Sequence, residues 1–244
     1  MLPLQDILPA GQAFREGSLD LPAVAPSVAE AAPSWIGNEV NSAILALAAV
    51  LFLTVMRDLK DLVPATAGCA IRWRGNLDIE HSVHLSRERN WAALTAVLFF
   101  CIIADRFSVY DPGFIGRLAA GWRLPATAGV FVAYLLFRRL AHLPFHPRKM
   151  HSEARKAVYS SFFNYLLLLM AALLPSAAIL LVTGAPDRTA RVVFLVECSI
   201  VFILFLVRKW QILKADCYFF ASFLYLCGLE ILPAALLVTS AVVL

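Results

Sequence analysis

The sequence predicts an all-α, polytopic integral membrane protein with about six transmembrane helices. Hydrophobic residues make up 61% of the chain, charged residues only 16%, and the mean hydropathy is +0.76. Soluble domains contain about 45–50% apolar and about 25% charged residues. The apolar residues are also gathered into runs with the charges between them. A helix crossing a hydrocarbon core of about 30 Å needs roughly 20 apolar residues, so these runs are read as membrane spans.

The first 38 residues differ from the rest and are expected to form a Pro/Ala-rich acidic tail. Five of the thirteen prolines precede Trp35, and between Met1 and Glu39 five acidic residues stand against one arginine. We expect this tail to be mostly irregular, and residues 39–244 to form the membrane domain.

Six apolar runs define the expected spans: Trp35–Met56, Trp91–Ala104, Leu124–Phe137, Tyr159–Val182, Val192–Val207 and Tyr218–Leu244. The second and third are short, so a re-entrant pair is the alternative to six full crossings. Of the 21 Lys and Arg residues, 15 fall in the segments 57–90, 138–158 and 208–216. Because basic loops stay in the cytoplasm, the bias predicts that both termini lie outside (N-out/C-out).

Three acidic residues lie inside these runs or at their edge. With a rise of about 1.5 Å per residue, Glu230 lies about 18 Å and Asp105 about 21 Å from the cytoplasmic side, and Glu197 roughly 8 Å from the outer side. All three depths fall in the outer half, so we expect one polar locus there. The possible counter-charges are Arg106, Arg123 and Arg191.

Two roles are open for this locus, because intramembrane ionisable residues usually face a bundle interior or a cavity. It can serve proton- or substrate-linked transport, or its carboxylates can pair with arginines and hold helices together. We expect the second role. Pro175 and Pro233 lack an amide proton and displace the carbonyl of the residue four positions earlier, so they are expected to kink their helices nearby.

The basic segment from Arg138 to Lys156 is expected to bind anionic lipid headgroups, at roughly 1 kcal/mol per basic residue. The residues chosen for this role are Arg138, Arg139, Arg148 and Lys149. His142, His146 and His151 are poorly spaced for a metal and are interrupted by prolines. "LDIEHSVHL" is read as a short surface hairpin with "RGN" as its turn, although a carboxylate–histidine site at His81 and His84 is conceivable.

No catalytic motif, cofactor site or metal site is expected. The chain carries no nucleophile elbow, phosphate loop or HExxH motif, and the five cysteines have no ligand spacing. The formal charge of +4 gives no support for a nucleic-acid partner. The protein is therefore not expected to be an enzyme.

The C-terminal run carries a resemblance. "YFFASFLYLCGLEILPAALL" closely resembles the signature LYLC-x-LEI-x-P of a family of multi-spanning inner-membrane proteins of Gram-negative bacteria, labelled domain of unknown function 4271. "SSFFNYLLLLMAALLP" is similar to the family's preceding long helix. The resemblance implies a fold and a compartment but no activity. Its family-defining positions here would be Leu226, Cys227, Leu229, Glu230, Ile231 and Pro233.

We therefore expect a non-catalytic accessory or assembly component of an envelope complex, with a membrane or periplasmic protein as its partner. The alternative is a small proton- or ion-coupled transporter subunit that uses Glu230 and Glu197. An enzyme acting on lipids comes last.

Overall fold

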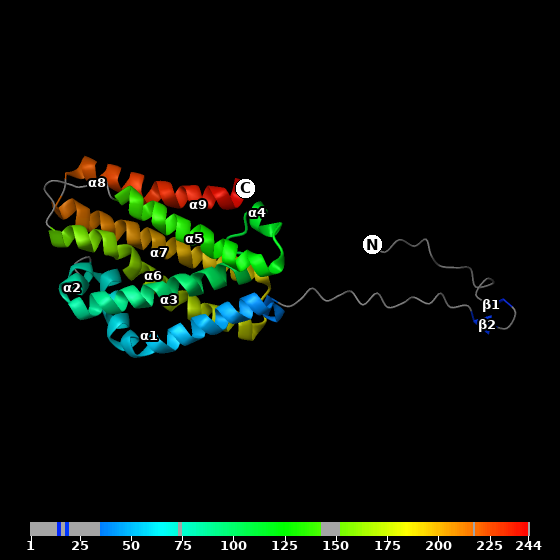
Figure 1. The fold of residues 1–244 in the computed structure, drawn as a ribbon. Coiled ribbons are helices and arrows are strands. Elements are labelled where there is room, and N and C mark those ends of the chain that lie inside the picture. Colours follow the sequence, from blue (N-terminus) through cyan, green and yellow to red (C-terminus); the bar gives the residue numbers. More distant parts are fainter. Residues whose placement is uncertain are drawn as a thin grey trace.

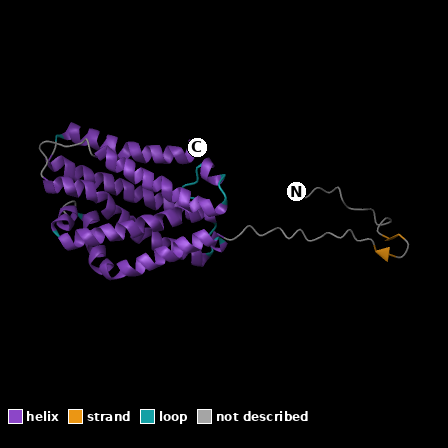
Figure 2. Ribbon diagram, in the orientation of Figure 1, coloured by secondary structure: helices purple, strands orange, loops and turns teal. Residues whose placement is uncertain are grey.

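The computed structural model describes residues 14–15, 18–19, 35–72, 75–142, 152–216 and 218–243 and shows a bundle of helices lying side by side (Figures 1 and 2). Two short strands, β1 (Phe14–Arg15) and β2 (Ser18–Leu19), pair antiparallel. The helices are η1 (Trp35–Gly37), α1 (Glu39–Ile71), α2 (Gly75–His81), α3 (Val83–Arg106), α4 (Gly113–Gly116), α5 (Ala120–His142), α6 (Ser152–Thr183), α7 (Asp187–Asp216), α8 (Phe219–Leu226), η2 (Cys227–Ile231) and α9 (Leu232–Val243).

Within the described residues, five helical segments are long and apolar enough to cross a membrane. They lie in α1, α5, α6 and α7 and in the continuous run formed by α8, η2 and α9. The predicted helical class is therefore confirmed for the bundle, and the length and composition of these five segments fit a multi-pass membrane protein. Helix α3 corresponds to the second expected run but falls outside this set.

Helix α3 is covered by neighbouring helices along most of its apolar stretch. It packs against α1, α5 and α6, and small residues such as Ala92, Ala93 and Ala96 are buried along it. Small side chains let neighbouring helices approach closely. A helix covered by protein on several sides needs less apolar length than one facing lipid.

The largest core cluster joins α3, α6 and α7. Ile103 and Phe107 at the end of α3 pack with Leu173 of α6 and Phe194 of α7. The Phe107 and Phe194 rings meet edge to face with centroids 4.9 Å apart. After this layer α6 ends at Thr183. Gly184 follows it with a φ of +63°, the left-handed conformation that glycine favours just after a helix.

The structure corrects the first predicted connection. Helix α1 continues to Ile71, fifteen residues beyond the predicted end at Met56, and the residues read as a hairpin form α2 and the start of α3. Helix α2 packs tightly against α1: a Cβ added to Gly75 would lie 2.9 Å from the carbonyl carbon of Gly68. The hairpin prediction failed because its alternation covered only nine residues, too few to separate a strand from a short helix.

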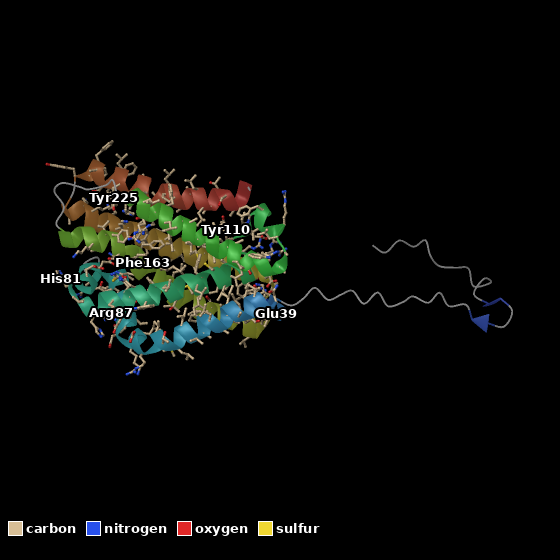
Figure 3. All side chains as sticks on the ribbon, viewed as in Figure 1. Glu39, His81, Arg87, Tyr110, Phe163 and Tyr225 are labelled. Carbon is tan, nitrogen blue, oxygen red and sulfur yellow. The ribbon has the colours of Figure 1, made fainter. Side chains whose placement is uncertain are left out.

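The two ends of the bundle are distinct in Figure 1. Helix α2 lies at one end, together with the C-terminal ends of α1, α5 and α7. We call this the basic end, because Arg72, Arg139 and Lys214 lie at those helix ends. Helix α4 and the C-terminal end of the chain lie at the other. Figure 3 places Tyr225 and His81 toward the basic end and Glu39 toward the opposite end.

Candidate functional site: a buried ion cluster at Glu230

Glu230 lies in a π-helical turn, η2, within the last membrane-length segment. Pro233 has no amide proton to donate to the carbonyl of Leu229, so the regular ladder cannot continue through this point. The backbone N–H of Leu232 instead bonds to the carbonyl of Cys227, five residues earlier. π turns inside α-helices occur frequently at functional sites. The predicted effect of Pro233 thus takes the form of a widened turn that carries Glu230.

Arg138 of α5 binds this carboxylate with two hydrogen bonds. Its Nε donates to Oε2 at 3.0 Å and its Nη2 to Oε1 at 2.8 Å. Such bidentate arginine–carboxylate pairs are among the strongest polar contacts in proteins. The guanidinium also lies over the ring of Phe162, 4.2 Å from its centroid. Arg138 is buried and paired inside the bundle, so its predicted headgroup role is wrong.

Lys209 of α7 donates to Oε1 of the same glutamate. Its side chain is 0% exposed, and those of Arg138 and Glu230 are 3% and 1% exposed. The Lys209 ammonium also lies 5.4 Å from the ring centroids of Phe205 and Tyr225. The aromatic faces supply part of the negative potential that two buried cations require.

His142, the last residue of α5, completes the cluster. Its Nε2 lies 3.3 Å from Oε1 of Glu230, and its Nδ1 is 2.8 Å from the hydroxyl of Tyr225. Arg138 and His142 are four residues apart and share one face of α5. We call Arg138, His142, Lys209, Tyr225 and Glu230 the Glu230 cluster.

The Glu230 cluster joins three separate parts of the bundle: α5, α7 and the segment α8–η2. An ionised carboxylate is costly in an apolar interior unless it is paired and hydrogen-bonded. Here both oxygens of Glu230 accept hydrogen bonds from cationic side chains, so the negative charge is compensated inside the bundle. The arrangement can hold three helices in register and, through His142 and Tyr225, offers a short path of exchangeable protons.

A second buried polar layer seats α2 at the basic end. Asn164 of α6 donates from Nδ2 to Oδ1 of Asn76, at 2.9 Å, and the Tyr165 hydroxyl donates to the carbonyl of Cys69 at 2.9 Å. Arg208 donates to the carbonyls of Ala70 and Ile71, which end α1. These bonds satisfy helix-end carbonyls that would otherwise lack donors.

The structure does not bring Glu230, Glu197 and Asp105 to one locus. Asp105 accepts a hydrogen bond from Trp35 Nε1 at 2.7 Å, and Glu197 accepts one from Ser176 Oγ at 2.9 Å. The single polar locus is therefore corrected to three separate sites. The prediction placed Glu230 and Asp105 at similar depths, but Glu230 contacts Arg138 and His142 at the C-terminal end of α5, whereas Asp105 contacts Trp35 at the opposite end of the bundle. Counting residues from the start of each run failed because the helices do not begin at one level.

The expected counter-charges also have other partners. Arg106 lies 3.6 Å from Asp187. Arg123 donates to the carbonyls of Gly116 and Leu118 and is near enough to Asp105 to act on it electrostatically. Arg191 is exposed.

Two of the four predicted headgroup residues, Arg148 and Lys149, lie outside the described residues, as do His146 and His151. Arg139 is exposed at the end of α5, and its headgroup role stays a prediction. In the described part of the chain, no group of three or more His, Cys, Asp or Glu side chains could hold a metal ion. His84 instead lies 3.0 Å from Glu88, one turn later on α3.

Lys209 is the cluster residue that the sequence-based reasoning missed, because it was counted as a loop residue. A signal was present: "KWQIL" continues the apolar pattern of α7 past Lys209. The spacing of Arg138 and His142 on one helix face was a second such signal.

Comparisons of the chain with protein-family models, with curated proteins and with solved structures gave no significant match. The resemblance carried by LYLC-x-LEI-x-P therefore stays a prediction.

Proposed function

We propose that the chain is a non-catalytic, multi-pass protein of the bacterial inner membrane that acts as an accessory or assembly component of an envelope complex. The observation that carries this proposal is that the Glu230 cluster is buried and its charges are paired with one another. Its carboxylate is paired on both oxygens with Arg138 and Lys209, and all three side chains are at most 3% exposed. An ion cluster of this kind holds helices together, whereas a transport site must open to water.

The topology belongs to the same proposal. We propose that α3 is the sixth span and that both termini lie outside, with the basic end in the cytoplasm. Arg138 and Lys209 are buried and no longer count as loop residues, but the segments on that side still contain more Lys and Arg than the other side. Labelling a Ser34→Cys variant in intact cells tests the orientation: a membrane-impermeant thiol reagent should reach it, and labelling only after the cytoplasm is exposed would overturn the orientation.

Purification of the tagged chain from native membranes in mild detergent tests the accessory role. We expect another envelope protein to co-purify at a constant ratio to the chain through a second separation step. A chain that always purifies alone would contradict the proposal. A tagged, unrelated multi-pass protein expressed at the same level controls for detergent-trapped neighbours.

A proton-coupled transporter is the second candidate, supported by the contacts from Glu230 to His142 and on to Tyr225. It would use the Glu230 cluster alone, because Glu197 lies at a separate site. Vesicles reconstituted with the chain would then show flux driven by a pH gradient, and Glu230→Gln would abolish it while the protein still inserts. The accessory role predicts no flux and a loss of thermal stability in the same variant.

A further inference from the structure

Glu197 is a carboxylate in a membrane-length helix that the bundle leaves half-covered. It lies ten residues from Asp187, the start of α7, which corresponds to about 15 Å along the helix. Its polar partner is Ser176 of α6. Among the described residues, no lysine, arginine or histidine forms an ion pair with it.

Ser176 cannot satisfy this carboxylate. Its hydroxyl has a single proton, and Oγ lies 2.9 Å from the carbonyl of Ala172, 3.2 Å from that of Leu173 and 2.9 Å from Glu197 Oε2. Three acceptors therefore compete for one donor. Oε1 of Glu197 has no donor among the described residues, and hydrocarbon chains offer none.

The neighbouring surface of α6 suits the close approach of another helix. Ala171, Ala172, Pro175 and Ala178 are exposed there, and small residues are typical of helix contacts in membranes. Pro175 cannot donate to the carbonyl of Ala171, so this face presents a second acceptor without its helical donor. A donor-rich side chain on an incoming helix would match a surface made of acceptors.

We propose that this face, defined by Ala171, Ala172, Pro175 and Ser176 of α6 with Glu197 of α7, binds a transmembrane helix of a second protein that carries one lysine or arginine at the depth of Glu197. The inference rests on the proposed accessory function, which requires such a partner, and it assigns that partner's chemistry. Charge complementarity selects the occupant, because an intramembrane carboxylate is expected to pair with a cation.

A second copy of this chain fits the face less well. The described basic residues of α7 lie toward its ends: Arg188, Arg191, Arg208, Lys209 and Lys214. In a parallel two-fold pair through this face, Glu197 of each copy would meet Glu197 of the other. Two carboxylates would then share a site that needs a cation.

The test uses a synthetic Leu/Ala transmembrane peptide with one lysine at the matching depth, and the same peptide with leucine in its place. Energy transfer to the labelled full-length chain in phosphatidylcholine vesicles measures binding. We expect the lysine peptide to bind about tenfold tighter than the leucine peptide, the ratio produced by a preference of about 1.4 kcal/mol. Glu197→Gln should remove this preference, and Glu39→Gln, which changes an exposed acid, should keep it.

Equal binding of the two peptides to the wild-type chain, or a lysine preference that survives in Glu197→Gln, would overturn the inference. So would energy transfer between two labelled copies that is lost in Glu197→Gln, because the face would then be a self-association surface. These results are separable from failure of the accessory role. Co-purification that persists in Glu197→Gln, together with equal binding of the two peptides to the wild-type chain, rejects this face alone. A wild-type chain that purifies alone rejects the accessory role.

Discussion

Glu230 and Glu197 are both glutamates inside apolar helices, and the structure treats them in opposite ways. Glu230 is enclosed and bound by Arg138 and Lys209 from two neighbouring helices. Glu197 is half-covered and shares one serine hydroxyl with two backbone carbonyls. The charge of Glu230 is compensated within the chain, while Glu197 has no cationic partner among the residues that the structure describes. Carboxylates of the same type can therefore mark an internal crosslink or an external contact, and their partners decide which.

The largest expected effect is at Glu230. Replacing it with glutamine leaves Arg138 and Lys209 buried without their counter-charge, and breaking a buried ion pair costs about 3–5 kcal/mol. Equilibrium unfolding in mixed micelles would measure the loss. Glu39→Gln, at an exposed helix start, is the control and should change stability by less than about 0.5 kcal/mol. If Glu230→Gln lowered the free energy of unfolding by no more than Glu39→Gln does, the distinction between Glu230 and Glu197 would be wrong.

Arg138→Lys sharpens the comparison because it keeps the charge and removes the geometry. Lysine cannot make the paired contacts to both oxygens of Glu230 or stack flat on Phe162. We expect unfolding to become easier by about 1.5–3 kcal/mol, the usual worth of hydrogen bonds to charged groups. Arg139→Lys, at the exposed neighbour, should leave the unfolding curve unchanged. If both variants behave alike, charge alone explains the cluster.

Tyr225→Phe tests the rim of the cluster. The change removes the hydroxyl that meets His142 Nδ1 but keeps the ring beside Lys209. A loss of about 0.5–1.5 kcal/mol is expected for one hydrogen bond. The same micelle experiment measures it, with Tyr159→Phe as the matched variant, because the Tyr159 ring also lies beside His142 but its hydroxyl has no hydrogen bond among the described residues. An effect as large as that of Glu230→Gln would mean that the hydroxyl, rather than the ion pairs, supports this region.

The smallest expected effect on stability is at Glu197. Glutamine there keeps a partner for Ser176 and removes no ion pair described within the chain, so unfolding should shift by less than about 0.5 kcal/mol. Thermal unfolding of the purified chain without a partner is the suitable measurement. A loss of several kcal/mol would show that Glu197, like Glu230, is part of the internal framework.

The sequence was sufficient to predict the helical membrane class, because several apolar runs of this length rarely form any other structure. It was insufficient for the partners of Glu230. Arg138 and Lys209 lie near the ends of α5 and α7, where basic residues normally serve as loop or headgroup residues. Hydropathy cannot show that their long side chains turn inward. The identity of a counter-ion depends on how helices rotate against one another, which a single sequence does not record.

The extension of α1 to Ile71 and the position of α2 were also out of reach. The predicted run ended at Met56, where charged residues begin, whereas α1 continues past them with Pro64 inside it. Helix α1 continues because Arg208, far along the chain, binds its last carbonyls. Helix α2 is held beside it because Asn76 has a buried partner in Asn164. Tertiary contacts of this kind override local signals for helix ends.

A double-mutant cycle between Glu230 and Lys209 tests the closed ion cluster most directly. Glu230→Gln, Lys209→Gln and the double variant are unfolded in the same micelles as the wild-type chain. If the two side chains compensate each other inside the bundle, the double variant should be more stable than the sum of the single losses predicts, by about 1–3 kcal/mol. Losses that add to within about 0.5 kcal/mol would contradict the cluster, because they would mean that Glu230 and Lys209 do not interact.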